Sequence, residues 1–173
     1  MKKKLKLKSL HFAVGALVIG AFLPIFIKND YYMMVLNRVL INIIVVLGLN
    51  FITGLTGQMN LGTAGIFALG AYSSALFTRY TNLTPWLGLI AAVIMGILIG
   101  RGLGYPSLRV RGVYLSLTTI GFGEVVRLLI SNTPKFTGGT QGIRNIRPYN
   151  IGSYQIQSQK EMYYLFLVFT AIA

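Results

Sequence analysis

The chain has 173 residues, of which 54% are hydrophobic and 11% are charged, and its mean hydropathy is +0.67. A soluble domain carries about 25% charged residues, so this chain has too little polar surface to cover a water-soluble globule, and its composition indicates a membrane protein. The net charge is +13, but most of the 16 lysines and arginines lie at the ends of apolar runs, which argues against nucleic-acid binding and indicates topology determinants that contact anionic lipid.

The first apolar run covers residues 10–27 and follows a head, MKKKLKLK, that contains five lysines. A secretory signal peptide has the same order of basic and apolar segments. This run is longer than a typical signal core, and KNDYY follows it in place of a small-residue cleavage site. We therefore interpret it as a transmembrane helix.

The second apolar run, residues 32–53, is long enough to span a bilayer and contains Asn42 and Asn50. These asparagines are eight residues apart, so they lie near one face of a helix. Polar side chains within a span face a protein neighbour or a water-filled path. The two asparagines either hold helices together or line a solute pathway, and both roles stay open.

The segment that follows, GLTGQMNLG at residues 54–62, combines three glycines with Gln58 and Asn60. Backbone that leaves helical form inside a membrane needs protein or a water-filled cavity to satisfy its N–H and C=O groups. Transporters use such broken helices to place polar groups near mid-membrane. We expect a broken or re-entrant helix here, and an ordinary cytoplasmic loop is the alternative.

Two further spans are expected at residues 61–78 and 86–103, joined by the turn RYTNLTP. The third run carries small side chains along one helix face, at Ala64, Ala68, Ala71 and Ala75. In the fourth run and just beyond it, glycine recurs every four residues, at Gly96, Gly100 and Gly104. This spacing is typical of a close contact between two membrane helices.

The fifth run, residues 112–131, contains Glu124 and Arg127 three positions apart, where their side chains can pair on one helix face. Pairing lowers the cost of placing a carboxylate in lipid, so the pair is either a structural salt bridge or part of coupling and gating. Thr118 and Thr119 either bond their own backbone or contact a solute.

A polar loop, residues 132–160, contains the glycine-rich TGGTQG. It lacks the pattern GxxxxGK[ST], so it is not a phosphate loop, and we expect no bound cofactor. Cysteine is absent and His11 is the single histidine, which excludes disulfides, histidine triads and histidine or cysteine metal clusters. A sixth apolar run starts near residue 162 and reaches Ala173 after about 18 Å of helix, so we expect a fragment or a chain that continues.

Charges at the ends of the runs predict the orientation. The lysine-rich head and the loop with Arg101, Arg109 and Arg111 are expected inside the cell, which makes the N-terminus cytoplasmic. Residues 132–160 then lie outside, although they carry four basic residues. Long loops follow the charge rule less strictly than short ones, so we keep this orientation.

Three stretches in order resemble the LivM-type permease family of ATP-binding-cassette importers for branched-chain amino acids. They are GLTGQMNLGTAGIFALGAY, LRVRGVYLSLTTIGFGEVVRLL and TGGTQG. The matching positions of the first are Gly57, Gln58, Leu61, Gly62, Phe67, Gly70, Ala71 and Tyr72. The second is matched by Arg109 or Arg111, Gly112, Tyr114, Thr118 or Thr119, Glu124 and Arg127, and the third by Thr137, Gly138, Gly139 and Gly142. Asn60 stands where the family more often has serine, a departure that bears on the solute preference.

The resemblance implies an all-α, polytopic transmembrane helix bundle that is one of two related permease subunits in the cell membrane. Two cytoplasmic ATPases would hydrolyse ATP, so this chain is not expected to be an enzyme, and an extracytoplasmic solute-binding protein would dock on residues 132–160. The family's second half, with its ATPase-coupling segment, has no counterpart here. Related scaffolds import urea, amides, sugars or nucleosides, and a non-transporting membrane assembly subunit is a further alternative.

Overall fold

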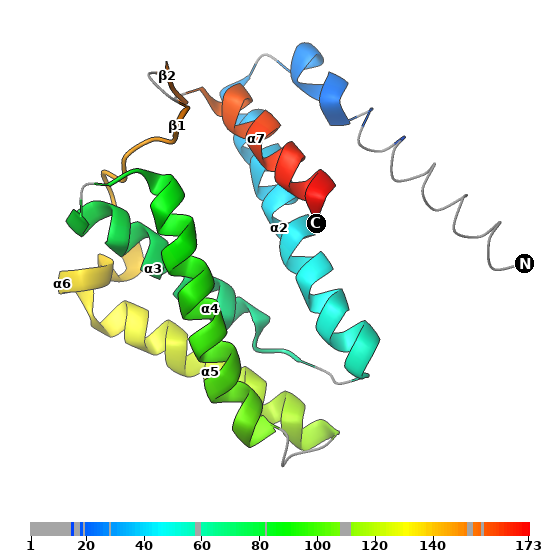
Figure 1. Ribbon diagram of the computed structural model, residues 1–173, viewed down its shortest axis with the longest axis vertical. Helices are drawn as coiled ribbons and strands as arrows, with labels where there is room; N and C mark the ends of the chain where they lie inside the picture. Colours follow the sequence, from blue (N-terminus) through cyan, green and yellow to red (C-terminus); the bar gives the residue numbers. More distant parts are fainter. Residues whose placement is uncertain are drawn as a thin grey trace, which may run out of the picture. The chain divides into compact units, whose positions relative to one another are not determined.

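The computed structural model describes residues 15, 18, 20–27, 29–57, 60–81, 83–107, 112–151, 154–156 and 158–173. These residues are mainly helical, which confirms the expected all-α class (Figure 1). The long helices are α2 (Asp30–Thr56), α3 (Thr63–Thr81), α4 (Pro85–Ser107), α5 (Val113–Asn132) and α7 (Gln159–Ile172). The short elements are α6 (Pro134–Thr137), the 3-10 helix η1 (Gly139–Gln141) and a hairpin of β1 (Asn150–Ile151) and β2 (Tyr154–Gln155).

Within the described ranges, three helical stretches are long and apolar enough to cross a membrane, which makes the chain a multi-pass membrane protein. They are Asp30–Gly54, Pro85–Gly102 and Val113–Asn132. Helix α3 occupies the expected third span but contains several hydroxyl side chains and is not among the three. The first expected span, residues 10–27, lies partly outside the described residues.

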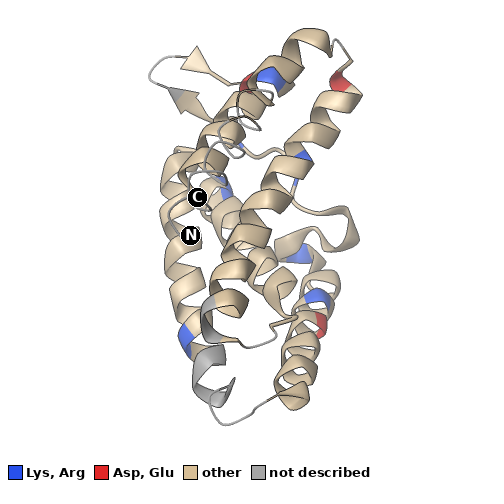
Figure 2. Cartoon of the chain, turned by 90° about the vertical axis from the view of Figure 1, so that its right-hand side faces the viewer, with Lys and Arg blue, Asp and Glu red and all other residues tan. Residues whose placement is uncertain are grey.

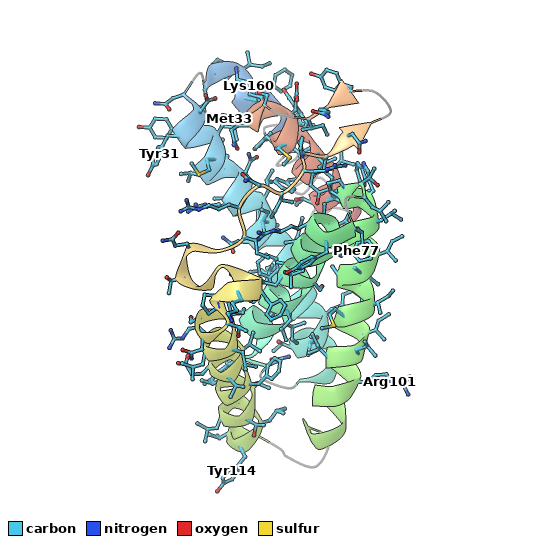
Figure 3. The ribbon with its side chains drawn as sticks, turned by 90° about the vertical axis from the view of Figure 1, so that its left-hand side faces the viewer. Tyr31, Met33, Phe77, Arg101, Tyr114 and Lys160 are labelled. Carbon is cyan, nitrogen blue, oxygen red and sulfur yellow. The ribbon has the colours of Figure 1, made fainter. Side chains whose placement is uncertain are left out.

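Two compact units make up the chain: residues 1–48 with 156–173, and residues 49–155. In the first unit, the side chain of Asn37 donates to the backbone oxygen and to Oε1 of Gln159, at 3.1 and 3.0 Å. The Tyr163 hydroxyl donates to the carbonyl of Gly20 at 2.8 Å. Met33, labelled in Figure 3, and Tyr163 are almost completely buried. Helices α2 and α7 are therefore joined by the hydrogen bonds between Asn37 and Gln159.

Helix α7 begins at a capping box, because Ser158 accepts a backbone hydrogen bond and Glu161 accepts one from the backbone of Ser158. This arrangement satisfies N–H groups that the first helical turn leaves without partners. It also explains why the expected polar loop ends in a sharply defined helix start.

In the second unit, α3 packs against both α4 and α5. A side chain on Gly88 of α4 would come within 2.6 Å of the Thr78 hydroxyl and 2.7 Å of the Ser74 hydroxyl of α3. The close approach of these two helices therefore requires glycine at this position. Of the segment expected as a polar loop, residues 132–160, the part up to residue 155 lies at the end of this unit and contains α6, η1 and the hairpin.

Candidate functional site

The chain leaves helical form between α2 and α3. Helix α2 ends at Thr56, Gly57 takes a left-handed φ of +65°, and α3 starts at Thr63. Residues 60–62 are non-helical, and Gln58 lies outside the described residues. A helix thus ends inside the expected segment, while a broken or re-entrant helix there, as opposed to an ordinary loop, stays a prediction.

Backbone groups at the break are satisfied by protein side chains. The N–H of Leu61 donates to the Thr119 hydroxyl of α5 at 3.1 Å, and this hydroxyl donates in turn to the carbonyl of Ser116 at 3.0 Å. The N–H of Gly62 donates to Oδ1 of Asn60 at 2.8 Å. Two donors that lipid would leave unpaired therefore have acceptors.

The break also lies in close contact with α5. A Cβ atom on Gly62 would be 2.6 Å from the carbonyl oxygen of Thr119, and one on Gly65 would be 3.0 Å from the Cα of Gly123. Real Cβ atoms essentially never approach backbone at 2.6 Å. Glycine at both positions lets the start of α3 touch the backbone of α5 directly.

This contact falls inside the length of α5. Thr119 is six residues after the first residue of α5, Val113, and thirteen before its last, Asn132. At 1.5 Å per residue, these separations are about 9 Å and about 20 Å. The break therefore lies beside the body of a candidate span and not beside its end.

The polar residues expected to line a pathway are brought together only in part. Asn60 and Thr119 each accept a backbone N–H at the break, from Gly62 and Leu61 respectively. Thr118 is exposed and donates to the carbonyl of Tyr114 at 2.9 Å. Asn42 and Asn50 are exposed on α2, and Asn42 belongs to the first compact unit while Asn50 belongs to the second.

Glu124 and Arg127 form a bidentate ion pair on α5. Arg127 Nε donates to Oε2 of Glu124 at 2.9 Å, and Nη2 donates to Oε1 at 2.5 Å. Both side chains are more than half exposed, at 65% for Arg127 and 52% for Glu124. Charged residues are sparse along the described helices, as Figure 2 shows, so this pair stands out in an apolar span.

Within the described residues, close helix contacts at glycine occur at positions that the spacing did not indicate, and a packing role for Gly96, Gly100 and Gly104 stays a prediction. A Cβ atom on Gly96 or Gly100 would meet nothing within 4 Å in the part of the chain that the structure describes, and Gly104 lies further along α4. Gly65 and Gly88 make the close contacts instead. In the alanine series, Ala64 and Ala71 are exposed. Spacing alone does not identify the partner helix, so it gave no signal for Gly88.

The TGGTQG motif builds the turn after α5. The Thr137 hydroxyl donates to the carbonyl of Thr133 at 2.8 Å and accepts from the N–H of Gly139 at 3.1 Å. Gly138 has a φ of 74°, and a Cβ there would be 2.1 Å from the carbonyl oxygen of Gly142. Its glycines are therefore required by the tight backbone turn.

The hairpin end of the second unit is anchored to the start of α4. The indole N–H of Trp86 donates to the carbonyl of Asn150 at 2.6 Å, and its ring packs edge-to-face on Tyr149 at a centroid distance of 5.3 Å. Burial raises the pKa of the Tyr149 hydroxyl. This anchor joins residues 64 positions apart, and the sequence analysis missed it.

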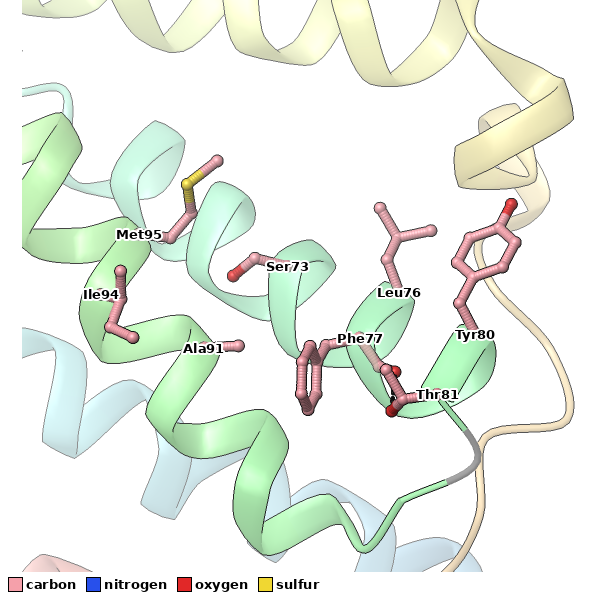
Figure 4. A pocket seen from close by; sticks show the side chains of 8 residues that line it. All are labelled: Ser73, Leu76, Phe77, Tyr80, Thr81, Ala91, Ile94 and Met95. Carbon is pink, nitrogen blue, oxygen red and sulfur yellow. Dashed lines mark hydrogen bonds between the residues drawn. The ribbon is translucent and has the colours of Figure 1, made fainter.

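An open groove runs between α3 and α4 (Figure 4). Its lining is apolar apart from hydroxyl groups, and its residues are Ser73, Leu76, Phe77, Tyr80, Thr81, Ala91, Ile94 and Met95. The hydroxyls of Ser73 and Thr81 donate to carbonyls of their own helix. The groove holds no charged group that would bind the head of a charged solute.

Comparison with known proteins gives a family and two relatives. The family described as "Branched-chain amino acid transport system / permease component" matches residues 31–173. The "High-affinity branched-chain amino acid transport system permease protein LivM" of Escherichia coli (strain K12) is 41% identical over 135 residues, and that of Salmonella typhimurium (strain LT2) is 40% identical. The matched region is 78% of this chain but 32% of each relative, so the chain spans about a third of their length. No solved structure matches.

Proposed function

The chain belongs to the family of branched-chain amino acid transport permeases, and we propose that it forms part of the membrane pathway of an ATP-driven importer. In this proposal the pathway carries branched-chain amino acids delivered by an extracytoplasmic binding protein. The names of the two relatives support the substrate class. The chain matches 32% of the length of each relative. Its part in the activity of a whole importer is therefore proposed from similarity.

The observation that carries the proposal is the contact of the helix break with α5. Leu61 and Gly62 meet Thr119 about 9 Å inside the length of a candidate span. Irregular backbone at such a depth is tolerated only against protein or a water-filled cavity. Transporters place solute sites at breaks of this kind, because loosened backbone offers polar groups without a charged residue.

Polar side chains near the break would contact the passing solute. Asn60 is half-buried and uses its Oδ1 on Gly62, which leaves its two amide N–H groups for a solute. Gln58 precedes it and would act in the same way. Asn42, Asn50 and Thr118 are exposed on apolar helices, so in a bilayer they require cover by protein or water.

The assembly that we propose follows the family resemblance. A second related permease subunit completes the pathway, two cytoplasmic subunits hydrolyse ATP, and the complex lies in the inner or plasma membrane with the N-terminus of this chain in the cytoplasm. The extracytoplasmic binding protein docks on the segment after α5. Lys135 and Arg144 are exposed in this segment.

Uptake measurements test the proposed function. The chain is produced with the subunits encoded beside it, in cells that lack branched-chain amino acid import, and uptake of radiolabelled leucine is measured. We expect ATP-dependent leucine uptake that disappears when this chain is omitted. Uptake of urea or of a sugar without uptake of leucine would contradict the proposed substrate, and no dependence on this chain would contradict a transport role.

A further inference from the structure

The Glu124–Arg127 ion pair lies near the middle of the span Val113–Asn132. Glu124 is about 16 Å from the start of this helix, in a hydrocarbon core about 30 Å thick. Charged groups at this depth are costly in lipid, and both side chains are more than half exposed on the described chain. The face that carries them is therefore turned to protein or to a water-filled path and not to acyl chains.

The pair has unused hydrogen-bonding capacity. A guanidinium has five N–H donors and a carboxylate has about four acceptor sites, and the bidentate contact uses two of each. A second carboxylate can bind the remaining donors of Arg127, and an ammonium group can bind the remaining acceptors of Glu124. The pair can thus accept one further anion and one further cation without opening.

Aliphatic side chains surround the pair on the same helix. Leu117 lies seven residues before Glu124, Ile120 lies four residues before it, and Leu128 lies four residues after it. The exposed fractions of the three side chains range from 44% to 60%. Residues at these separations share a helix face. The surface thus combines a paired positive and negative charge with branched aliphatic groups.

We propose that this surface binds an α-amino acid directly. The carboxylate of the amino acid contacts Arg127, its ammonium group contacts Glu124, and its aliphatic side chain lies on Leu117, Ile120 or Leu128. This inference rests on the proposed transport function and names the point at which the solute's head group is held. Glu124 directly follows Gly123, which packs on Gly65 of α3. Glu124 is also five residues after Thr119, so the site begins about 8 Å along α5 from the contact with the break.

A photoreactive amino acid tests the site in the complete transporter. The probe is a leucine analogue with a diazirine in its side chain, which keeps both head-group charges. Membrane vesicles with the parent complex are supplied with the probe and ATP and then irradiated, and labelled peptides are mapped by mass spectrometry. We expect label on residues 117–128 that an excess of leucine prevents. Label confined to other segments, or its absence, would overturn the inference.

Charge variants give the second arm of the test. Glu124→Gln and Arg127→Gln each remove one contact with the head group, so we expect labelling of α5 and leucine uptake at limiting concentration to fall about tenfold or more. Arg79→Gln, which removes an exposed cation at the end of α3, is the matched control and should label as the parent does. Parent-like labelling in both Glu124→Gln and Arg127→Gln would overturn the inference.

Assembly separates a binding site from a subunit contact. The subunits of each variant complex are co-purified, and Glu124→Asp and Arg127→Lys replace any variant that fails to assemble. If the ion pair only joins subunits, its variants would fail to assemble and α5 of the parent complex would stay unlabelled. That result would overturn the inference. If the parent imports leucine and α5 is unlabelled, the inference fails and the transport function stands. If the parent imports no amino acid, the proposed function fails first.

Discussion

A methyl group on Gly62 would lie 2.6 Å from the carbonyl oxygen of Thr119, so the segment that leaves helical form is in direct backbone contact with α5. The hydroxyl of the same threonine accepts the N–H of Leu61. One turn of α5 thereby fixes the break by shape and by a hydrogen bond at once. Mutations of Gly62 and of Thr119 measure separately how the close packing and the hydrogen bond contribute to stability.

Gly62→Ala should destabilise the protein by about 1–3 kcal/mol, because the new methyl group forces backbone atoms apart. Thermal unfolding of the purified protein measures this loss. Gly96→Ala is the control, since a side chain at Gly96 meets nothing within 4 Å and alanine favours helix over glycine. Equal unfolding temperatures for Gly62→Ala and the parent would show that the contact yields without cost.

Thr119→Val should also destabilise the protein, by about 1 kcal/mol, because it leaves the partly buried N–H of Leu61 without the Thr119 hydroxyl as an acceptor. Thr118→Val is its neighbour and control. The Thr118 hydroxyl is exposed and bonds the backbone of its own helix, so its loss should change the free energy of unfolding little. Unfolding in denaturant compares the two, and a larger effect at Thr118 would contradict the described contact.

Asn37→Ala should loosen the start of α7. Asn37 donates to both the backbone and the side chain of Gln159, but its own Oδ1 is buried with no hydrogen-bond partner among the described residues, so part of the cost of burying the amide is already present. We expect a net loss of about 1 kcal/mol, which speeds amide hydrogen exchange in the first turn of α7 by roughly fivefold. Asn42→Ala, at an exposed position of α2, should leave this exchange unchanged.

The helices could be predicted because long apolar runs bounded by glycine, proline and charge leave few other structures in a membrane. The run expected at residues 86–103 corresponds to α4, and α2 ends within the glycine-containing segment 54–62. These features depend on neighbours in the sequence. Local patterns were therefore sufficient to find them.

Contacts between distant residues could not be predicted in this way. Gly88 and Gly96 look alike in the sequence, yet only Gly88 faces the hydroxyls of α3. The bond between Asn37 and Gln159 joins residues 122 positions apart, and no periodicity reports it. The partner of a membrane helix is set by three-dimensional packing, which a single sequence does not contain.

The double variant Gln58→Leu with Asn60→Leu tests the pathway at the break. Both substitutions keep the segment apolar enough to insert, but they remove the amide groups that we propose contact the solute, and Asn60→Leu also removes the acceptor of the Gly62 N–H. We expect normal amounts of the protein in the membrane, intact co-purification with the partner subunits, and leucine uptake reduced by at least about tenfold. Asn60→Ser is the matched control for folding, because serine also accepts the backbone bond and should retain the amount of protein in the membrane and its assembly. Undiminished uptake by the double variant would return the segment to an ordinary loop, and loss of uptake in Asn60→Ser as well would assign the effect to asparagine itself.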